Sequence, residues 1–99
     1  MDRDVKTPCF FKRLYNEYAE SFDIDCYFLD TVRRGSRGHL ITGYTHIGQH
    51  FESDLDFALR LLDAPPAEYS ELLTELTELI GYNLEIIADP VNYILHNTI

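Results

Sequence analysis

The sequence predicts an α+β fold: a small single domain whose antiparallel sheet of three to four strands is covered on one face by helices. Ninety-nine residues suffice for one hydrophobic core but not for two. Hydrophobic residues make up 45% of the chain and include seven Tyr and six Phe, which is enough apolar surface for a folded core. Helical and strand-like spacing alternate along the chain. We therefore expect residues 1–99 to form one compact domain, with a frayed N-terminus at residues 1–6.

The first element is predicted to be a helix over residues 8–21. Thr7 is a suitable N-cap, and Pro8 suits the first helical position. The apolar side chains that follow recur every three or four residues, as on one face of a helix: Phe11, Leu14, Tyr15, Tyr18 and Phe22.

A β-hairpin is predicted next. Residues 24–29 are rich in β-forming side chains, and residues 39–47 again carry β-branched and aromatic residues. Between them, residues 33–38 form a turn-rich loop of three arginines, two glycines and a serine. Two strand-like runs around a loop that contains glycine indicate a hairpin.

A short helix is predicted over residues 54–62. Ser53 and Asp56 resemble a capping box, with Asp in the place where Glu is usual. Apolar residues then continue at helical spacing: Leu55, Ala58, Leu59 and Leu62. The sequence Asp-Ala-Pro-Pro at residues 63–66 ends this helix, and Pro66 can begin the next one.

The next predicted helix, residues 66–80, has the clearest pattern and ends before Gly81, the residue type expected just past a helix. Its apolar stripe is expected in the core and comprises Tyr69, Leu72, Leu73, Leu76, Leu79 and Ile80. Residues 84–87 are predicted to form a third strand, and residues 91–95 a fourth after an Asp-Pro turn. The predicted order is α-β-β-α-α-β-β, with the helices on one face of the sheet.

The charge of the chain is strongly asymmetric. The net charge is −9, yet residues 1–37 hold seven acidic and seven basic residues. Residues 38–99 hold ten acidic residues and one base, Arg60. Such a surface repels free nucleic acid and attracts basic partners. We therefore expect no direct binding of nucleic acid.

Localisation is expected to be cytoplasmic. The apolar runs are too short for a transmembrane helix. Residues 1–4, Met-Asp-Arg-Asp, lack the basic start and apolar stretch of a secretory signal. No membrane partner is expected.

Four glutamates, Glu68, Glu71, Glu75 and Glu78, form the acidic helix face. They fall within an arc of roughly 80° of the helix that the sequence predicts over residues 66–80. None has a Lys or Arg three or four residues away within this helix, so their mutual repulsion is mildly unfavourable for folding. Two interpretations follow: a solvated face that keeps the protein soluble, or a surface that docks on a basic site.

The leading functional hypothesis is a non-enzymatic acidic interaction protein that docks on a basic protein surface. Its concrete form is a nucleic-acid-mimicking inhibitor of a nucleic-acid-handling or defence enzyme, of the kind a phage or mobile element would encode. The predicted partner-binding residues are Glu68, Glu71, Glu75, Glu78, Asp54 and Asp56, with secondary contacts from Arg33, Arg34 and Arg37. No cofactor is expected, and the sequence does not predict the oligomeric state.

A different chemistry is suggested by residues 43–54, which contain Tyr44, His46, His50, Glu52 and Asp54. The two histidines are four apart and would share a face on a helix. Their neighbours favour a strand, which would separate them by roughly 13 Å, too far for one metal ion to bridge. We therefore expect no structural metal here. The alternative function is a small metal-dependent or proton-transfer protein centred on His46, His50 and Glu52.

Nucleophilic catalysis is not indicated by the sequence. Cys9 and Cys26 lie beside apolar residues, and we expect two buried, reduced thiols that do not pair. Sixteen residues separate them, where a zinc finger has two to four. The chain has no G-x-S-x-G, HExxH or phosphate-loop motif, so no enzyme is predicted. A further alternative is a subunit of a larger assembly, held by exposed tyrosines and the arginine loop.

Overall fold

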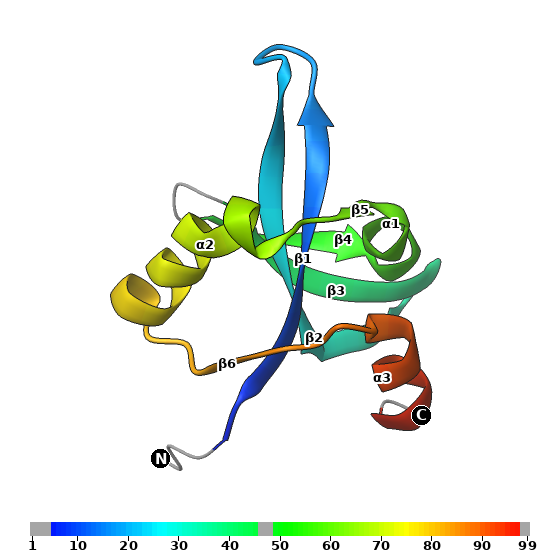
Figure 1. The fold of residues 1–99 in the computed structure, drawn as a ribbon. Helices are drawn as coiled ribbons and strands as arrows, with labels where there is room; N and C mark the ends of the chain where they lie inside the picture. The colour runs from blue at the N-terminus through cyan, green and yellow to red at the C-terminus, as the bar shows by residue number, and fades with distance from the viewer. Residues whose placement is uncertain (1–4, 46–48, 98–99) are drawn as a thin grey trace.

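A long antiparallel hairpin lies at the centre of the computed structural model, which describes residues 5–45 and 49–97 (Figure 1). Its strands, β1 and β2, pair from Asn16 opposite Ser21 to Cys9 opposite Phe28. In chain order the elements are β1 (Thr7–Asn16), β2 (Ser21–Gly35), β3 (Gly38–Thr45), β4 (Gln49–Asp54), α1 (Leu55–Arg60), β5 (Leu62–Asp63), α2 (Pro66–Thr74), the π-helical segment η1 (Glu75–Ile80), β6 (Leu84–Ile86) and α3 (Pro90–Asn97).

The sheet is mostly antiparallel and has six strands. Five of them lie in the order β4-β3-β2-β1-β5, and β6 pairs with β1 in parallel along Thr7–Cys9. The predicted α+β class and the predicted β2–β3 hairpin are confirmed. The prediction of three to four strands is wrong, and the elements follow a different order, because β1, β4 and β5 were not foreseen.

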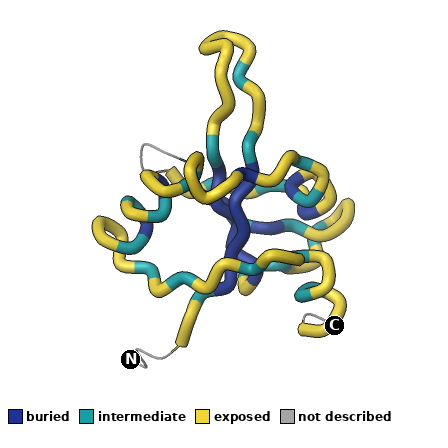
Figure 2. The backbone as a smooth tube through the Cα atoms, in the orientation of Figure 1, coloured by how far each residue is buried: buried dark blue, intermediate teal, exposed yellow. Residues whose placement is uncertain are grey.

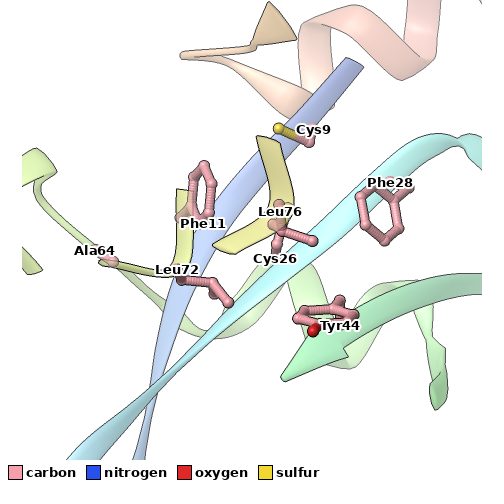
Figure 3. Close-up of a cluster of buried hydrophobic side chains, with 8 residues drawn as sticks. All are labelled: Cys9, Phe11, Cys26, Phe28, Tyr44, Ala64, Leu72 and Leu76. Atoms are coloured by element: carbon pink, nitrogen blue, oxygen red, sulfur yellow. The ribbon is translucent and has the colours of Figure 1, made fainter. Parts of the chain in front are cut away.

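Helices cover both faces of the sheet, which corrects the prediction of one covered face. Side chains alternate between the faces of a strand, so the buried residues divide into two clusters. The α2-side cluster comprises Cys9, Phe11, Cys26, Phe28, Tyr44, Ala64, Leu72 and Leu76 (Figure 3). The α1-side cluster comprises Phe10, Tyr27, Leu29, Ile41, Leu55 and Ala58, and Tyr93 and Ile94 of α3 also pack on it.

The predicted helix over residues 8–21 is wrong, since these residues form β1, a turn and the start of β2. Three consecutive side chains are all buried: Cys9 and Phe11 in the α2-side cluster, and Phe10 between them in the α1-side cluster. A strand between two layers buries every side chain of such a run, whereas an amphipathic helix exposes part of it. Burial on both faces therefore decides against the helix.

A turn ends β1 at Asn16. The side-chain oxygen of Asn16 accepts hydrogen bonds from the backbone N–H groups of Tyr18 and Ala19, at 3.0 and 3.2 Å. Asn favours turns because its side chain can satisfy backbone groups in this way. Glu20 completes the turn with a positive φ of 53°. The chain then returns as β2.

The predicted fourth strand at residues 91–95 is also wrong, because this segment lies in the helix α3. Asp89 Oδ1 accepts a hydrogen bond of 3.0 Å from the backbone N–H of Asn92, and Pro90 occupies the first helical position. An acidic cap followed by proline is a helix-start signal, and here it outweighs the β-propensity of Val91 and Ile94. The third predicted strand is confirmed as β6, one residue shorter than expected.

The helix predicted over residues 66–80 is confirmed, and Gly81 follows it with a φ of +96°. Its last six residues wind as the π-helical segment η1, and the N–H of Gly81 donates to the carbonyl of Leu76, five residues back. Leu76 is fully buried, but Leu79 and Ile80 are 79% and 47% exposed. The prediction that both lie in the core is wrong: in the wider π-helical winding Leu79 no longer follows Leu76 on one face, and Ile80 is the last residue of the segment.

The short helix predicted at residues 54–62 is confirmed as α1, two residues shorter at its C-terminus and one at its N-terminus. Asp54 rather than Ser53 is its N-cap, and no side-chain hydrogen bond caps it. The predicted capping box is therefore wrong. The hydroxyl of Ser53 instead donates to the carbonyl of Asp54, at 3.1 Å.

The outer part of the β1–β2 hairpin, residues 13–24, projects from the rest of the molecule and is called the arm (Figures 1 and 2). In the part of the chain that the structure describes, the neighbouring strands pair only with the base of this hairpin. The β5 pairing nearest the hairpin tip is at Arg13, and the β3 pairing nearest the tip is at Asp25. Several large side chains of the arm are exposed: Leu14, Tyr15, Tyr18 and Phe22.

The predicted fraying at residues 1–6 falls mostly on residues outside the described part of the chain. Residues 1–4 are not described. The carbonyl of Val5 accepts a hydrogen bond from the side chain of Asn83, at 3.3 Å, and β1 begins at Thr7.

Candidate functional site

The acidic helix face is divided by the fold into two kinds of position. Glu68, Glu71 and Glu78 are exposed, whereas Glu75 is half-buried at the start of η1. The hydroxyl of Tyr44 donates a hydrogen bond to the carboxylate of Glu75. Glu75 therefore links the helix to β3, and the outward-facing acidic row consists of the other three glutamates.

The Tyr44 ring is buried in the α2-side cluster (Figure 3), and its hydroxyl contacts Glu75. The hydrogen bond to the carboxylate is the main reason that the pKa of Tyr44 is raised to about 12. Loss of the phenol proton would break this bond and place two negative charges side by side. The tyrosine therefore stays neutral at physiological pH.

Glu68 is partly neutralised by Arg13, a base from outside its own helix. The sequence pattern of the helix could not show this pair. Arg13 on β1 forms an ion pair with Glu68 at 3.4 Å, and its guanidinium also lies 4.9 Å from the ring centre of Phe22. Partly exposed pairs of this kind contribute about 1 kcal/mol or less. Arg13 thus connects the arm to α2 without removing the acidic character of the helix.

A groove of about 160 Å³ lies between the arm and α2. Three apolar and three acidic residues line it: Phe22, Asp23, Ile24, Glu68, Glu71 and Leu72. Ile24 and Leu72 are the less exposed of them and form its floor. Ile24 packs against the α2-side cluster, to which Leu72 belongs. The carboxylates of Glu68 and Glu71 therefore stand beside an apolar floor to which the arm and α2 both contribute. The Asp23 carboxylate instead accepts a hydrogen bond of 3.1 Å from the side-chain amide of Asn16.

Asp54 and Asp56, the other two predicted binding residues, lie on the opposite side of the sheet from the acidic helix face. They belong to the N-terminal end of α1, whose Leu55 and Ala58 pack in the α1-side cluster. Asp56 forms an ion pair of 2.7 Å with Arg60. The six predicted acidic residues therefore do not form one surface.

Arg37 is the predicted secondary-contact residue that the fold brings to Asp54 and Asp56. A cavity of about 490 Å³ opens between the β2–β3 loop and α1. Its lining mixes charges of both signs with apolar residues: Arg37, Gly38, His39, Asp54, Leu55, Asp56, Phe57, Leu59 and Arg60. The mixture gives no clear preference for an anion or a cation.

The loop predicted over residues 33–38 is shorter than expected, because β2 runs to Gly35 and β3 begins at Gly38. The other two arginines therefore lie in β2 and have different surroundings. Arg33 pairs with Glu52 and also donates to the hydroxyl of Thr42 at 3.2 Å, so it ties β2 to β3 and β4. Arg34 is exposed and has no ion pair among the residues that the structure describes. The arginine loop is thus not one basic patch.

The predicted alternative centre is only partly visible, because His46 lies outside the described residues. His50 and Glu52 lie on the same face of β4, two residues apart. They have different partners, since His50 Nε2 and the Tyr82 hydroxyl share a hydrogen bond of 2.9 Å while Glu52 pairs with Arg33. Over residues 5–45 and 49–97, no three His, Cys, Asp or Glu side chains come together as they would around a metal ion.

The two cysteines are free thiols, both completely buried in the α2-side cluster. Cys9 lies in β1 rather than at a helix start, diagonally across from Cys26. Burial, reinforced by the nearby Cys9 thiol, strongly raises the pKa of Cys26. Because the thiolate is the nucleophile, this environment disfavours covalent catalysis at Cys26.

The aromatic residues of the arm were missed as candidates for binding, since Tyr15, Tyr18 and Phe22 were assigned to the packed face of a helix. Tyr18 is 101% exposed at the tip of the arm. One local signal favoured a turn there: Asn16, a residue type typical of turns, is followed by the polar residues Glu17 and Glu20.

Comparison of the chain with protein-family models, with curated proteins and with solved structures found no match. Among the helices that the structure describes, none is long and apolar enough to cross a membrane.

Proposed function

We propose that this chain is a non-enzymatic interaction protein that docks on a basic surface of another protein through the outer side of α2 and η1. The observation that carries the proposal is the groove between the arm and α2, where Glu68 and Glu71 stand beside an apolar floor of Ile24 and Leu72. A lysine or arginine side chain can place its aliphatic stem on such a floor and its charge among the carboxylates.

The distribution of ion pairs supports the same proposal. Several bases are engaged away from α2: Lys12 with Asp63, Arg33 with Glu52, and Arg60 with Asp56. On the α2 side, Arg13 compensates Glu68, while Glu71 and Glu78 are exposed on a helix without a basic residue of its own. The excess negative charge of the chain is therefore presented in part by this helix.

The proposed partner is a protein that normally binds nucleic acid, and the proposed effect is inhibition by mimicry. The Cβ atoms of residues three or four apart on a helix are about 5–6 Å from one another, so their carboxylates can stand in for successive phosphates of a nucleic-acid strand. Glu68 and Glu71, both in α2, have this spacing, and Glu78 is a further exposed carboxylate on η1. A defence or nucleic-acid-handling enzyme of a host cell, opposed by a phage or mobile element, is the setting that we propose.

The test is affinity capture from a cell extract with the wild-type protein and with the Glu68, Glu71, Glu78→Gln variant. Proteins retained by the wild type and lost by the variant are identified by mass spectrometry, and one of them is purified. We expect a basic protein whose binding weakens by about tenfold or more in the variant and declines with salt. Added nucleic acid should compete with the wild-type chain. Equal capture by both forms would remove the support for this function.

Two alternatives from the sequence make different predictions. A metal-dependent or proton-transfer protein centred on His46, His50 and Glu52 should contain near-stoichiometric metal after purification or lose its activity when His50 is replaced. A subunit of a larger assembly should be captured with constant stoichiometry, independently of Glu68, Glu71 and Glu78. Metal content and the capture experiment therefore separate the three functions.

A further inference from the structure

We propose that the arm is an apolar anchor for the basic partner, binding an amphipathic segment that carries both basic and apolar side chains. This inference rests on the proposed function and adds a second binding element to it. The arm bears large apolar side chains that are well exposed: Tyr15 is 52% exposed, Phe22 is 44% exposed and Tyr18 is fully exposed. Aromatic residues of this kind are enriched among the side chains that dominate binding energy at protein interfaces.

Two of these rings extend the face of the sheet that α2 covers elsewhere. Tyr15 and Phe22 are cross-strand partners in an edge-to-face arrangement, with ring centres 5.4 Å apart. By strand alternation, Tyr15 lies on the same face as Phe11, which stacks on Tyr69 of α2 with ring centres 4.2 Å apart. The apolar face therefore continues beyond the helix onto the arm and joins the groove at Phe22.

The arm does not need Tyr18 for its own stability, so the exposure of this ring has another cause. The pair Tyr15–Phe22 stabilises the hairpin whether or not a partner binds, as cross-strand aromatic pairs do. The ring of Tyr18, in contrast, contacts no other aromatic ring within the described chain. Its backbone N–H is held by Asn16, so the tip presents this side chain from a defined turn.

The charges around the arm indicate which kind of molecule binds it. Glu17, Glu20 and Asp23 are exposed acidic residues of the arm, and Glu68 and Glu71 line the opposite side of the groove. A second copy of this chain, which also has a net charge of −9, would bring like charges together. A basic segment of a different protein brings opposite charges to the rim and apolar side chains to the rings.

The test uses short fluorescent peptides as probes, with affinity measured by fluorescence anisotropy at low and raised salt. One peptide alternates lysine with leucine and a second alternates lysine with serine. The proteins compared are the wild type, Tyr18→Ser and Phe57→Ser. Phe57 is a half-exposed aromatic residue of α1, on the opposite side of the sheet, and serves as the matched control. Circular dichroism checks that each variant is folded.

We expect the lysine–leucine peptide to bind wild type about tenfold more tightly than the lysine–serine peptide. Tyr18→Ser should weaken binding of the lysine–leucine peptide about fivefold and leave the lysine–serine peptide almost unchanged. Phe57→Ser should change neither. If both peptides bind equally in a salt-dependent way, or if Tyr18→Ser has no effect, the anchor is refuted while the proposed acidic docking surface stands.

Two other outcomes have separate meanings. If neither basic peptide binds in a salt-dependent way, both the acidic docking surface and the anchor are refuted. Sedimentation velocity then tests the competing occupant: a wild-type dimer that Tyr18→Ser dissociates would show that the arm binds a second copy, and would overturn the proposed basic partner.

Discussion

The two halves of the β1–β2 hairpin share one register but have different environments. In the inner half, Cys9, Phe11, Cys26 and Phe28 are at most 4% exposed, because α2 and η1 cover them. In the arm, Tyr15 and Phe22 continue the same face but are 52% and 44% exposed, and the Arg13 guanidinium lies 4.9 Å from the ring centre of Phe22. A covering helix thus makes the difference between core residues and surface residues on one pair of strands.

The boundary between the halves is marked by buried polar residues. Lys12 and Asp25 are cross-strand partners on the other face of the hairpin, and each is 6% exposed. Lys12 forms an ion pair of 2.5 Å with Asp63 of β5, whose carboxylate reaches solvent. Asp25 accepts a long hydrogen bond of 3.4 Å from the hydroxyl of Tyr27. The inner half is therefore the part of the hairpin whose burial stabilises the fold, whereas the arm beyond it is largely exposed.

The sharpest test of this comparison replaces the same residue type in each half of one strand. Phe28→Ala should lower the free energy of unfolding by about 3–5 kcal/mol, because it leaves a cavity beside Tyr82, on which Phe28 stacks. Phe22→Ala should cost about 1 kcal/mol, the contribution of its contacts with Tyr15 and Arg13. Urea denaturation measures both values. Equal costs would contradict the division into core and arm.

The covering helix offers a second matched pair. Leu76→Ala should lower the free energy of unfolding by about 2–5 kcal/mol, as buried leucines do. Leu79→Ala, three residues later, should change it by less than about 0.5 kcal/mol, because its side chain is 79% exposed. Thermal and urea denaturation check both. A large cost at Leu79 would mean that η1 winds as an ordinary α-helix in solution.

A third test concerns pH and the boundary residue Asp25. Burial raises the pKa of Asp25 above its usual value of 3.8, although hydrogen bonds from Thr45 and Tyr27 oppose the shift. The folded protein therefore holds this proton at a pH where the unfolded chain has lost it. Stability should fall as the pH rises from about 3.8 through the raised pKa, and then become constant as far as this group is concerned.

Asp25→Asn should abolish that decline. The difference in unfolding free energy between Asp25→Asn and wild type should move in favour of the variant as the pH rises from about 3 to about 7. Urea denaturation at several pH values measures this difference, with Asp30→Asn on the exposed part of β2 as a control. Parallel pH profiles for Asp25→Asn and wild type would refute the assignment.

The smallest effect on stability is expected from the acidic helix face. The Glu68, Glu71, Glu78→Gln variant should unfold within about 0.5 kcal/mol of wild type, because these side chains are exposed and lie outside both clusters. Relief of their mutual repulsion and loss of the ion pair with Arg13 act in opposite directions. Differential scanning calorimetry checks the result. A large loss of stability would show that the acidic row is structural.

Local signals determined a substantial part of this fold. The proline at residue 66, the leucine pattern after it and Gly81 were sufficient for the helix over residues 66–80, because each acts within one or two turns. The glycine-containing loop between two β-rich runs was likewise sufficient for the hairpin of β2 and β3. The exposure of Glu68, Glu71 and Glu78 also followed from their spacing relative to Leu72 and Leu76.

Tertiary structure decided between helix and strand for residues 8–21. Their apolar side chains fit helical spacing, but a strand is stable only with hydrogen-bonding neighbours. These neighbours are β2, which is close in sequence, and β5 and β6, whose paired residues are at least 49 positions away. The polar strand β4 was missed for a similar reason. Its charged residues suit an exposed sheet edge, and their strand conformation depends on pairing with β3.

The arrangement of the candidate site was decided in the same way. The sequence shows that Asp54, Asp56 and the four glutamates are acidic, but not that α1 and α2 pack on opposite faces of the sheet. Nor does it show that Arg13 reaches Glu68, 55 residues away, or that Tyr44 binds Glu75. Periodicity describes which side of its own helix or strand a residue occupies. The neighbours of that side depend on how the elements pack, and long-range contacts alone determine them.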